Sequence, residues 1–279
     1  MQRRPLDVAV LSDIHLGTYG CKARELLNYL RSIQPNILIL NGDIVDGWQF
    51  SKRFFPAAHM QVIKELMHFI SNGTRVFYIT GNHDEMLRRY SDMYMGNFTL
   101  TDKLVLEIDR QMVWIFHGDV FDNTTRGSAK MIAKLGSSGY GLLILFNRLV
   151  NNVLGFFGQE RVSISKKVMQ GVNKAVAKIN DLEHIATGLA IKKKYDYVIC
   201  GHIHRPEMKT IETPEGKVVY LNSGDWVEHL TALEYNHNEW KIFRYDAKDF
   251  PVSGVPEIKP TLNVITGGIT VRLNSVNFK

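Results

Sequence analysis

Five short apolar runs in this chain each end in a cluster of Asp, Asn or His, and this pattern restricts the fold more than any other feature. The clusters are Asp13-Ile14-His15, Gly42-Asp43, Gly81-Asn82-His83-Asp84, His117-Gly118-Asp119 and Gly201-His202-Ile203-His204. They are spread over almost two hundred residues, so only a fold that gathers strand ends at one edge could unite them. Oxygen and nitrogen donors without a thiolate predict a site for two divalent cations.

The composition bounds the class of protein. At 279 residues the chain can hold one large domain, or one domain with an insertion. Hydrophobic residues make up 45% and charged residues 22%, as in a globular protein with a substantial core. The formal net charge of +6 weakly favours an anionic partner, but it does not separate a phosphate ester from nucleic acid or acidic lipid. Two cysteines, Cys21 and Cys200, predict reduced thiols in a cytoplasmic protein.

The start of the chain does not read as a targeting segment. The first apolar run is short and stops at Ser12, whereas a secretory signal has a longer apolar stretch and a cleavage site. No run of about 18 apolar residues predicts a membrane span.

The first third of the chain alternates strand and helix patterns. Strands are predicted over residues 7–12, 37–41 and 75–80, with helices over 21–33 and 58–72 between them. This β-α-β-α-β order predicts parallel strands with helices on the faces of the sheet. In such sheets functional residues collect beyond the carboxyl ends of the strands, which is where the clusters fall.

The remainder reads as a more antiparallel half with an insertion. A hairpin is expected from 100–108 and 111–116, and an insertion of helical character over about residues 127–195. Later strands are expected at 197–200, 217–222, 230–235 and 240–245. We therefore expect one domain over residues 1–250 and a C-terminal tail, 251–279, without an assigned role.

The middle of the insertion, residues 141–157, has one apolar and one polar face and is too polar to span a bilayer. One interpretation is a helix that packs on the domain core. The other is a lid that grips an apolar substrate or lies on a membrane surface, helped by neighbouring lysines.

The clusters suggest particular ligands. Asp13 and His15 lie two residues apart, so both can point toward one pocket. Asp43 follows a glycine that permits a tight turn, and its carboxylate can bridge two cations about 3.5–4 Å apart. Asn82 adds an amide oxygen. Imidazoles suit Mn, Fe, Zn or Co better than Ca or Mg, and they come from His117, His202 and His204.

Two such ions would lower the pKa of water, neutralise phosphoryl oxygens and align attack with departure of the leaving group. His83, beside Asn82, is better placed as a non-ligand that donates a proton to the leaving oxygen or stabilises developing charge. We predict Asp43 and His83 as the catalytic residues. Asp84 has two equally weighted roles, orienting His83 or capping a helix over 85–90.

Other polar and aromatic residues are given weaker roles. Arg126 and Lys130 are either substrate-phosphate contacts or solvated residues at a helix start. His229 is either a pocket residue or structural, and Trp48 either a core or a pocket-wall aromatic. Surface positions are expected for His59, His68, His184 and His237.

Taken in this order, the five motifs resemble the calcineurin-like metallophosphoesterase superfamily over about residues 7–245. The resemblance implies a four-layer α/β/β/α sandwich with a binuclear site at the sheet edge and His83 as the catalytic acid. It implies that Asp13, His15, Asp43 and His204 hold one metal, and that Asp43, Asn82, His117 and His202 hold the other.

Finer features resemble one branch, the bacterial UDP-2,3-diacylglucosamine pyrophosphatases. They are His117-Gly118-Asp119, the insertion that follows, and Asn222-Ser223-Gly224-Asp225-Trp226. The resemblance implies manganese, with iron or zinc as alternatives, and a phosphorylated, lipid-linked substrate of lipid A synthesis. It also implies a helical lid and peripheral contact with the inner face of the cytoplasmic membrane. Where that branch carries Gly-Asn-Arg-Asp, this chain has His83.

Two rival hypotheses remain. A phosphodiesterase acting on nucleotides or nucleic acid would share the chemistry, but the apolar character of 142–157 argues against a nucleic-acid partner. A metal-holding interaction protein without turnover belongs to another class, and the full ligand set with His83 argues against it. The oligomeric state is not predicted.

Overall fold

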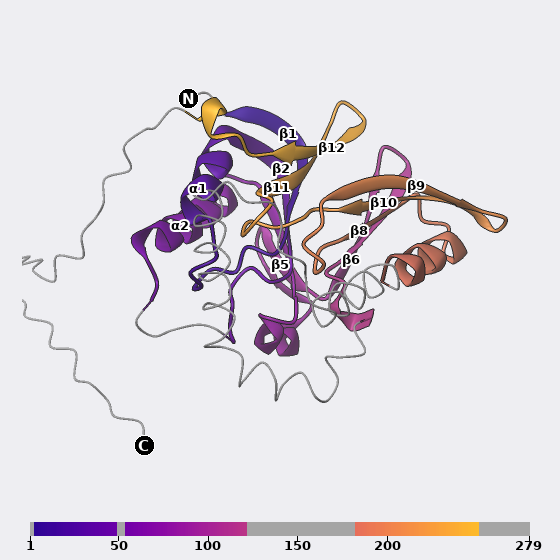
Figure 1. The fold of residues 1–279 in the computed structure, drawn as a ribbon, viewed down its shortest axis with the longest axis horizontal. Coiled ribbons are helices and arrows are strands. Elements are labelled where there is room, and N and C mark those ends of the chain that lie inside the picture. Colours follow the sequence, from indigo (N-terminus) through magenta and orange to yellow (C-terminus); the bar gives the residue numbers. More distant parts are fainter. Residues whose placement is uncertain (1–2, 49–53, 122–181, 251–279) are drawn as a thin grey trace, which may run out of the picture.

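The computed structural model describes residues 3–48, 54–121 and 182–250. These residues form two facing β-sheets, with helices on the outer side of each sheet (Figure 1). The layers therefore run helix, sheet, sheet, helix, and the predicted α/β/β/α sandwich is confirmed. The expected helix over 141–157, the side chains of Arg126 and Lys130, and the tail 251–279 lie outside the described residues.

The larger sheet has seven strands and a parallel centre. Strands β1, β2, β3 and β5 run parallel, whereas β12, β11 and β4 are antiparallel to their neighbours. In spatial order the strands are β12 (Glu239–Arg244), β11 (Thr231–Asn236), β1 (Arg4–Leu11), β2 (Ile33–Asn41), β3 (Arg75–Ile79), β5 (Phe98–Thr101) and β4 (Met93–Met95).

Helices α1 (Ala23–Ser32) and α2 (Ala57–Ser71) cover the outer face of this sheet (Figure 1). In α1 the apolar residues Leu26, Leu27 and Leu30 recur at helical spacing and are fully buried. Full burial of each such side chain contributes about 1.5–3 kcal/mol. The predicted helix is confirmed, with its ends moved inward by one or two residues.

The smaller sheet has five strands and is covered by a helix over residues 182–192 (Figure 1). Leu182, Ala186 and Ala190 of this helix pack with Val198 and Cys200 in one buried cluster. In spatial order the strands are β6 (Lys103–Ile108), β7 (Gln111–Phe116), β8 (Tyr197–Cys200), β10 (Gly216–Asn222) and β9 (Glu207–Thr213).

The alternation of side chains along β1 joins the layers. Val8 and Val10 point into the core between the two sheets, whereas Ala9 and Leu11 belong to the core under α1 and α2. Because both faces of β1 are buried over residues 8–11, that part of the strand is apolar throughout rather than alternating.

The structure corrects the expected strand over 100–108. Residues Phe98–Thr101 pair with β3 in the larger sheet, and Lys103–Ile108 pair with β7 in the smaller one. Asp102 lies at the break, where one of its oxygens accepts a hydrogen bond from Thr80 (2.5 Å) and lies 3.4 Å from Nε of Arg88. A polar side chain held in this way lets the chain change sheets without a long loop.

Strand β9 was not predicted from the sequence. It is an edge strand with sequence Glu-Met-Lys-Thr-Ile-Glu-Thr, and its residues are exposed or half-buried. Charged, solvent-facing edges are a common way to prevent further strand pairing, so the apolar signal is weak there.

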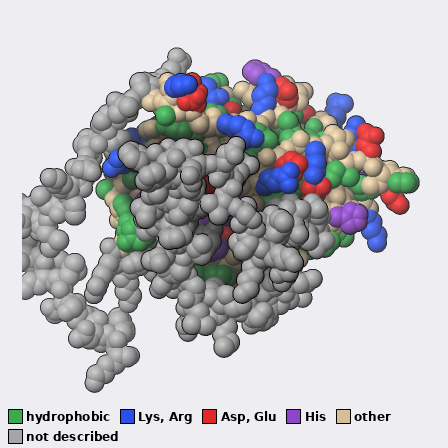
Figure 2. Space-filling view, viewed as in Figure 1, with side chains coloured by type: hydrophobic (Ala, Val, Ile, Leu, Met, Phe, Trp, Pro, Cys, Tyr) green, Lys and Arg blue, Asp and Glu red, His purple; other side chains and the backbone are tan. Residues whose placement is uncertain are grey.

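Charged side chains are interspersed over the described surface in Figure 2. Lys and Arg side chains lie beside Asp and Glu side chains on this face rather than forming one basic area. Among the residues that the structure describes, no helix has the length and apolar character needed to cross a bilayer.

Candidate metal centre

All five polar clusters follow the carboxyl ends of parallel strands. The first three follow β1, β2 and β3 of the larger sheet, and the other two follow β7 and β8 of the smaller sheet. The two sheets face each other, so these ends meet at one edge of the sandwich. The structure therefore brings together six of the metal ligands that the sequence suggested: Asp13, His15, Asp43, His117, His202 and His204. Asn82, the seventh, is buried, and the amide of its neighbour His83 donates to Oδ1 of Asp43 (2.8 Å).

Five of these residues adopt left-handed backbone conformations. Their φ angles are 53° for Asp13, 54° for His15, 55° for Asp43, 67° for His202 and 53° for His204. Residues other than glycine rarely adopt such angles, and Asp and His tolerate them better than most. Conformations of this kind cluster at functional sites, where the surrounding structure enforces them.

Hydrogen bonds between the loops enforce these conformations. The amide of Asp13 donates to the carbonyl of Gly42 (3.0 Å), and the amide of His15 donates to that of Asp43 (2.9 Å). The amide of His202 donates to Oδ2 of Asp13 (3.0 Å), which links the two sheets. The donors are therefore positioned by the backbone before any ligand binds.

Two glycines allow the loops to approach this closely. Gly42 has a φ of +81°, and a Cβ atom there would collide with the ring of His117. A Cβ atom on Gly81 would collide with the Asp43 carboxylate. The glycine in each motif is thus required by the space around the neighbouring ligand.

Asp13, His15 and His204 form the first group of converging donors. Nε2 of His204 lies 3.1 Å from Oδ1 of Asp13 and 3.4 Å from Nε2 of His15. Two ring nitrogens that face each other this closely are the arrangement expected of ligands around one cation.

Asp43, His117 and His202 form a second group, whose ligand atoms lie within 4.8 Å of one another. Nε2 of His117 lies 3.3 Å from Oδ2 of Asp43, and Nδ1 of His117 lies 2.8 Å from the carbonyl oxygen of Asn41. This second contact leaves Nε2 available as a ligand. A third overlapping group contains His15, Asp43 and His83.

The donor set fits divalent cations. Oδ1 of Asp13, Oδ1 of Asn82 and Nε2 of His117 are buried and lack hydrogen-bond partners. The 3.1 Å contact of Asp13 Oδ1 with His204 has ion-pair distance without hydrogen-bond geometry. Buried polar atoms without partners are costly, and cations bound to the two donor groups would satisfy all three.

The charges in the centre are mutually stabilising. Burial opposes ionisation of Asp13, but His204 and His117 outweigh it and lower the pKa of Asp13 to about 2. Burial likewise opposes ionisation of Asp43, yet His117, His15 and His83 hold the pKa of Asp43 well below its usual value. Both carboxylates are therefore ionised at neutral pH, as metal ligands must be.

Asp46 has a role that the sequence did not suggest. It is almost fully buried, and its Oδ2 lies 2.8 Å from Nδ1 of His83 and 3.2 Å from Nδ1 of His15. Burial lowers the pKa of His83, but Asp46 and Asp43 outweigh this and raise it. The available signal was the position of Asp46 three residues after Asp43, on the same loop.

Both roles suggested for Asp84 are wrong. Its carboxylate does not cap the 3-10 helix η1 (Glu85–Tyr90), and Asp46 rather than Asp84 binds His83. The Asp84 oxygens accept hydrogen bonds from the amides of Ile44 (3.0 Å) and Gly81 (2.5 Å), and from the hydroxyl of Tyr78 (2.6 Å). Asp84 therefore links the loop that carries Asp43 to the loop that carries Asn82.

The remaining expectations, for single histidines and Trp48, have mixed outcomes. His59 is buried, contrary to prediction, and its Nδ1 accepts a hydrogen bond from the amide of Gly17 (2.9 Å). Trp48 lies against His83, with ring centroids 4.8 Å apart, as a pocket-wall aromatic would. Nδ1 of His229 lies 2.6 Å from Asp225, which favours the structural alternative. The expected exposure is confirmed for His68, His184 and His237.

The family model described as calcineurin-like phosphoesterase matches residues 6–206, which include all five polar clusters. The chain belongs to this family. It is accordingly a metal-dependent hydrolase of phosphoesters, and the sequence-based resemblance to the superfamily is confirmed.

Curated relatives extend over nearly the whole chain. A UDP-2,3-diacylglucosamine hydrolase of Stenotrophomonas maltophilia is 23% identical over 240 residues, covering 83% of this chain and 96% of the relative. One of Aliivibrio fischeri is 22% identical over 254 residues, covering 88% and 100%. Among solved structures, the phosphoesterase Yfce of E. coli aligns with a TM-score of 0.41 and 12% identity, covering 88% of this chain and 94% of that one.

Proposed function

We propose that this phosphoesterase uses two divalent cations to cleave the pyrophosphate bond of a lipid-linked nucleotide such as UDP-2,3-diacylglucosamine. The observation that carries the proposal is the pair of donor groups at one sheet edge, Asp13-His15-His204 and Asp43-His117-His202. The third group, which contains both His15 and Asp43, lies between them and supports Asp43 as the ligand shared by two ions.

The residues would divide the work as follows. Asp13, His15, Asp43 and His204 would hold one ion, and Asp43, Asn82, His117 and His202 the other, with Mn as the first candidate metal and Fe or Zn as alternatives. Ions bound there supply an activated water nucleophile and neutralise phosphoryl oxygens.

His83 would protonate the leaving oxygen. Nδ1 of His83 faces Asp46 (2.8 Å), so Nε2 is the atom directed to substrate. Nε2 lies 4.0 Å from Oδ2 of Asp43, so the proton donor is held beside the shared ligand.

Relatives named as UDP-2,3-diacylglucosamine hydrolases motivate the choice of substrate. We propose residues 1–250 as the catalytic domain, with an insertion that begins near residue 127 and acts as a lid over acyl chains. We also propose peripheral contact with the cytoplasmic face of the membrane. The helix over 182–192 packs on the smaller sheet and belongs to the sandwich itself.

The test is hydrolysis of UDP-2,3-diacylglucosamine and of bis-p-nitrophenyl phosphate, each with added Mn and with chelator. We expect Mn-dependent release of UMP, and its loss in Asp43→Asn. Turnover of the generic diester alone would keep the phosphoesterase and reject the lipid-linked substrate. Metal binding without turnover of either compound would favour a non-catalytic interaction protein.

A further inference from the structure

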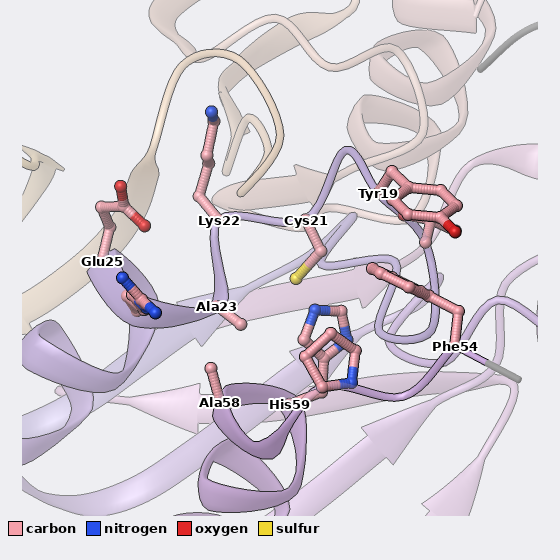
Figure 3. A pocket seen from close by; sticks show the side chains of 11 residues that line it. Tyr19, Cys21, Lys22, Ala23, Glu25, Phe54, Ala58 and His59 are labelled. Atoms are coloured by element: carbon pink, nitrogen blue, oxygen red, sulfur yellow. The ribbon is translucent and has the colours of Figure 1, made fainter. Parts of the chain in front are cut away.

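We infer that a cavity beside the metal centre binds the planar base of a nucleotide substrate. The cavity has a volume of about 220 Å³ and lies between the first turns of α1 and α2 and the loop that follows His15 (Figure 3). The inference rests on the proposed function, because it assigns a site to the nucleoside part of the substrate.

The position of the cavity suits a substrate that also reaches the ions. Helices α1 and α2 follow β1 and β2, so their N-termini lie at the same sheet edge as the metal ligands. Thr18 lines the cavity, and its hydroxyl donates to the carbonyl of His15 (2.9 Å). Three Cα–Cα steps place Thr18 within about 11 Å of His15, a span that a ribose and its phosphates can bridge.

One wall of the cavity is an aromatic ledge. The rings of Tyr19 and Phe54 lie with their centroids 3.7 Å apart and their planes 33° apart. Tyr19 is 78% exposed, so this ring is presented at the surface rather than packed into the core. Any of the nucleobases can stack on an exposed aromatic ring, because every base has a π-face.

A second wall consists of small side chains. The sulfur of Cys21 points toward His59 and the methyl groups of Ala23 and Ala58 (Figure 3). These short side chains leave a space next to the ledge instead of filling it. The volume of about 220 Å³ lies below the usual range of sites for drug-sized ligands, about 300–1,000 Å³, and suits a single ring system.

The rim carries charged side chains and free backbone amides. Lys22, Arg24 and Glu25 line the cavity, with the charged ends of Lys22 and Glu25 directed outward (Figure 3), and α1 begins at Ala23 without a side-chain cap. Amide groups of an uncapped first turn can donate to ring carbonyls, and a carboxylate can accept a ring N–H. Mostly apolar walls with a few polar groups are typical of small-molecule sites, whereas an acyl chain would gain nothing from these charges.

The experiment compares UMP with ribose 5-phosphate, which keeps the phosphate and lacks the base, by calorimetric titration of the full-length, Mn-loaded protein. We expect UMP to bind about five- to hundredfold more tightly than ribose 5-phosphate, the range given by stacking of one base. Tyr19→Ala should abolish this preference, and Tyr19→Phe should keep it. Ala58→Leu, which fills the cavity from α2, should also abolish it.

Tyr94→Ala is the matched control, because Tyr94 is 75% exposed and lies on β4 at the far edge of the larger sheet. It should leave the UMP preference unchanged. Equal binding of the two compounds by the wild type, or an undiminished preference in Tyr19→Ala, would overturn the base site. If bis-p-nitrophenyl phosphate is still hydrolysed with Mn in that case, the proposed function stands and only the base site fails.

Discussion

Nδ1 of His83 lies 2.8 Å from Oδ2 of Asp46, and the same oxygen lies 3.2 Å from Nδ1 of His15. One buried carboxylate therefore fixes the ring orientation of both the proposed proton donor and a proposed metal ligand. In each imidazole it leaves Nε2 as the atom that faces the centre of the site.

Replacement of Asp46 should therefore impair catalysis more than metal binding. We expect Asp46→Ala to lower kcat by about ten- to hundredfold, the usual effect of removing such a supporting carboxylate. KM should change little. Metal content, measured by plasma emission spectroscopy, should fall less than in His15→Ala. Equal metal loss in the two variants would show that Asp46 acts through the ion alone.

His83→Ala should retain metal and lower turnover of substrates with a poor leaving group by about a hundredfold or more. The loss should be smaller with bis-p-nitrophenyl phosphate, because p-nitrophenolate departs without a proton. His83→Arg provides the sharper comparison, since it keeps a positive charge and cannot donate a proton at neutral pH. Wild-type turnover in that variant would assign His83 an electrostatic role.

Asp43→Asn should empty or half-empty the metal centre, because the shared ligand loses its charge. The measurement is metal per chain after dialysis against Mn, with Asp246→Asn as the control. Asp246 is exposed and caps the short helix η3 (Ala247–Asp249), away from the ligand loops. Two ions retained per Asp43→Asn chain would contradict a bridging role.

His59 should contribute to the acid sensitivity of the fold. Burial lowers the pKa of His59 from its usual value of 6.5, and its Nδ1 must stay unprotonated to accept the Gly17 amide. The unfolded chain thus takes up this proton at higher pH than the folded one. The contribution of His59 to the free energy of unfolding is therefore complete above about pH 6.5 and is lost as the pH falls below that value.

In His59→Asn the amide oxygen can replace Nδ1 without titrating. We expect the decrease in Tm between pH 7.5 and pH 5.5 to be smaller in this variant than in the wild type. His68→Asn, at an exposed histidine of the same helix, should leave the decrease unchanged. An identical decrease in all three proteins would exclude His59 as the titrating group.

Both thiols should be protected in the native protein. Burial raises the pKa of Cys21 to about 12, and burial also raises that of Cys200. The thiolate is the reactive form, so reaction with Ellman's reagent at pH 8 should be about a hundredfold or more slower than in guanidinium chloride. Two equivalents should react in the denatured chain. A fast native equivalent would show that the cavity at Cys21 admits the reagent.

The fold could be predicted where local pattern and tertiary role agree. Leu26 and Leu30 recur at helical spacing because α1 buries one face, and residues 8–11 are uniformly apolar because β1 is buried on both faces there. The sheet change at Asp102 was missed, because an apolar–polar alternation looks the same in either sheet. The exposed strand β9 was missed because it buries too little to leave an apolar pattern.

The ligand set could be predicted because each residue directly follows an apolar strand. Residues that act through another residue leave no such mark. Asp46 and Asp84 are both carboxylates near a motif, and only the three-dimensional contacts show that Asp46, not Asp84, reaches His83. His59 sits in an amphipathic helix like any surface histidine, and its partner Gly17 lies on a different loop.

The donors come from both halves of the sandwich: Asp13, His15, Asp43 and Asn82 from the larger sheet, and His117, His202 and His204 from the smaller one. Bound ions would thus cross-link segments that lie far apart in the chain, as disulfides do in secreted proteins. At a free ion concentration one hundred times the dissociation constant, ion binding adds about 2.7 kcal/mol per site to the free energy of unfolding. Loss of metal would then weaken the contact between the two sheets as well as stop turnover.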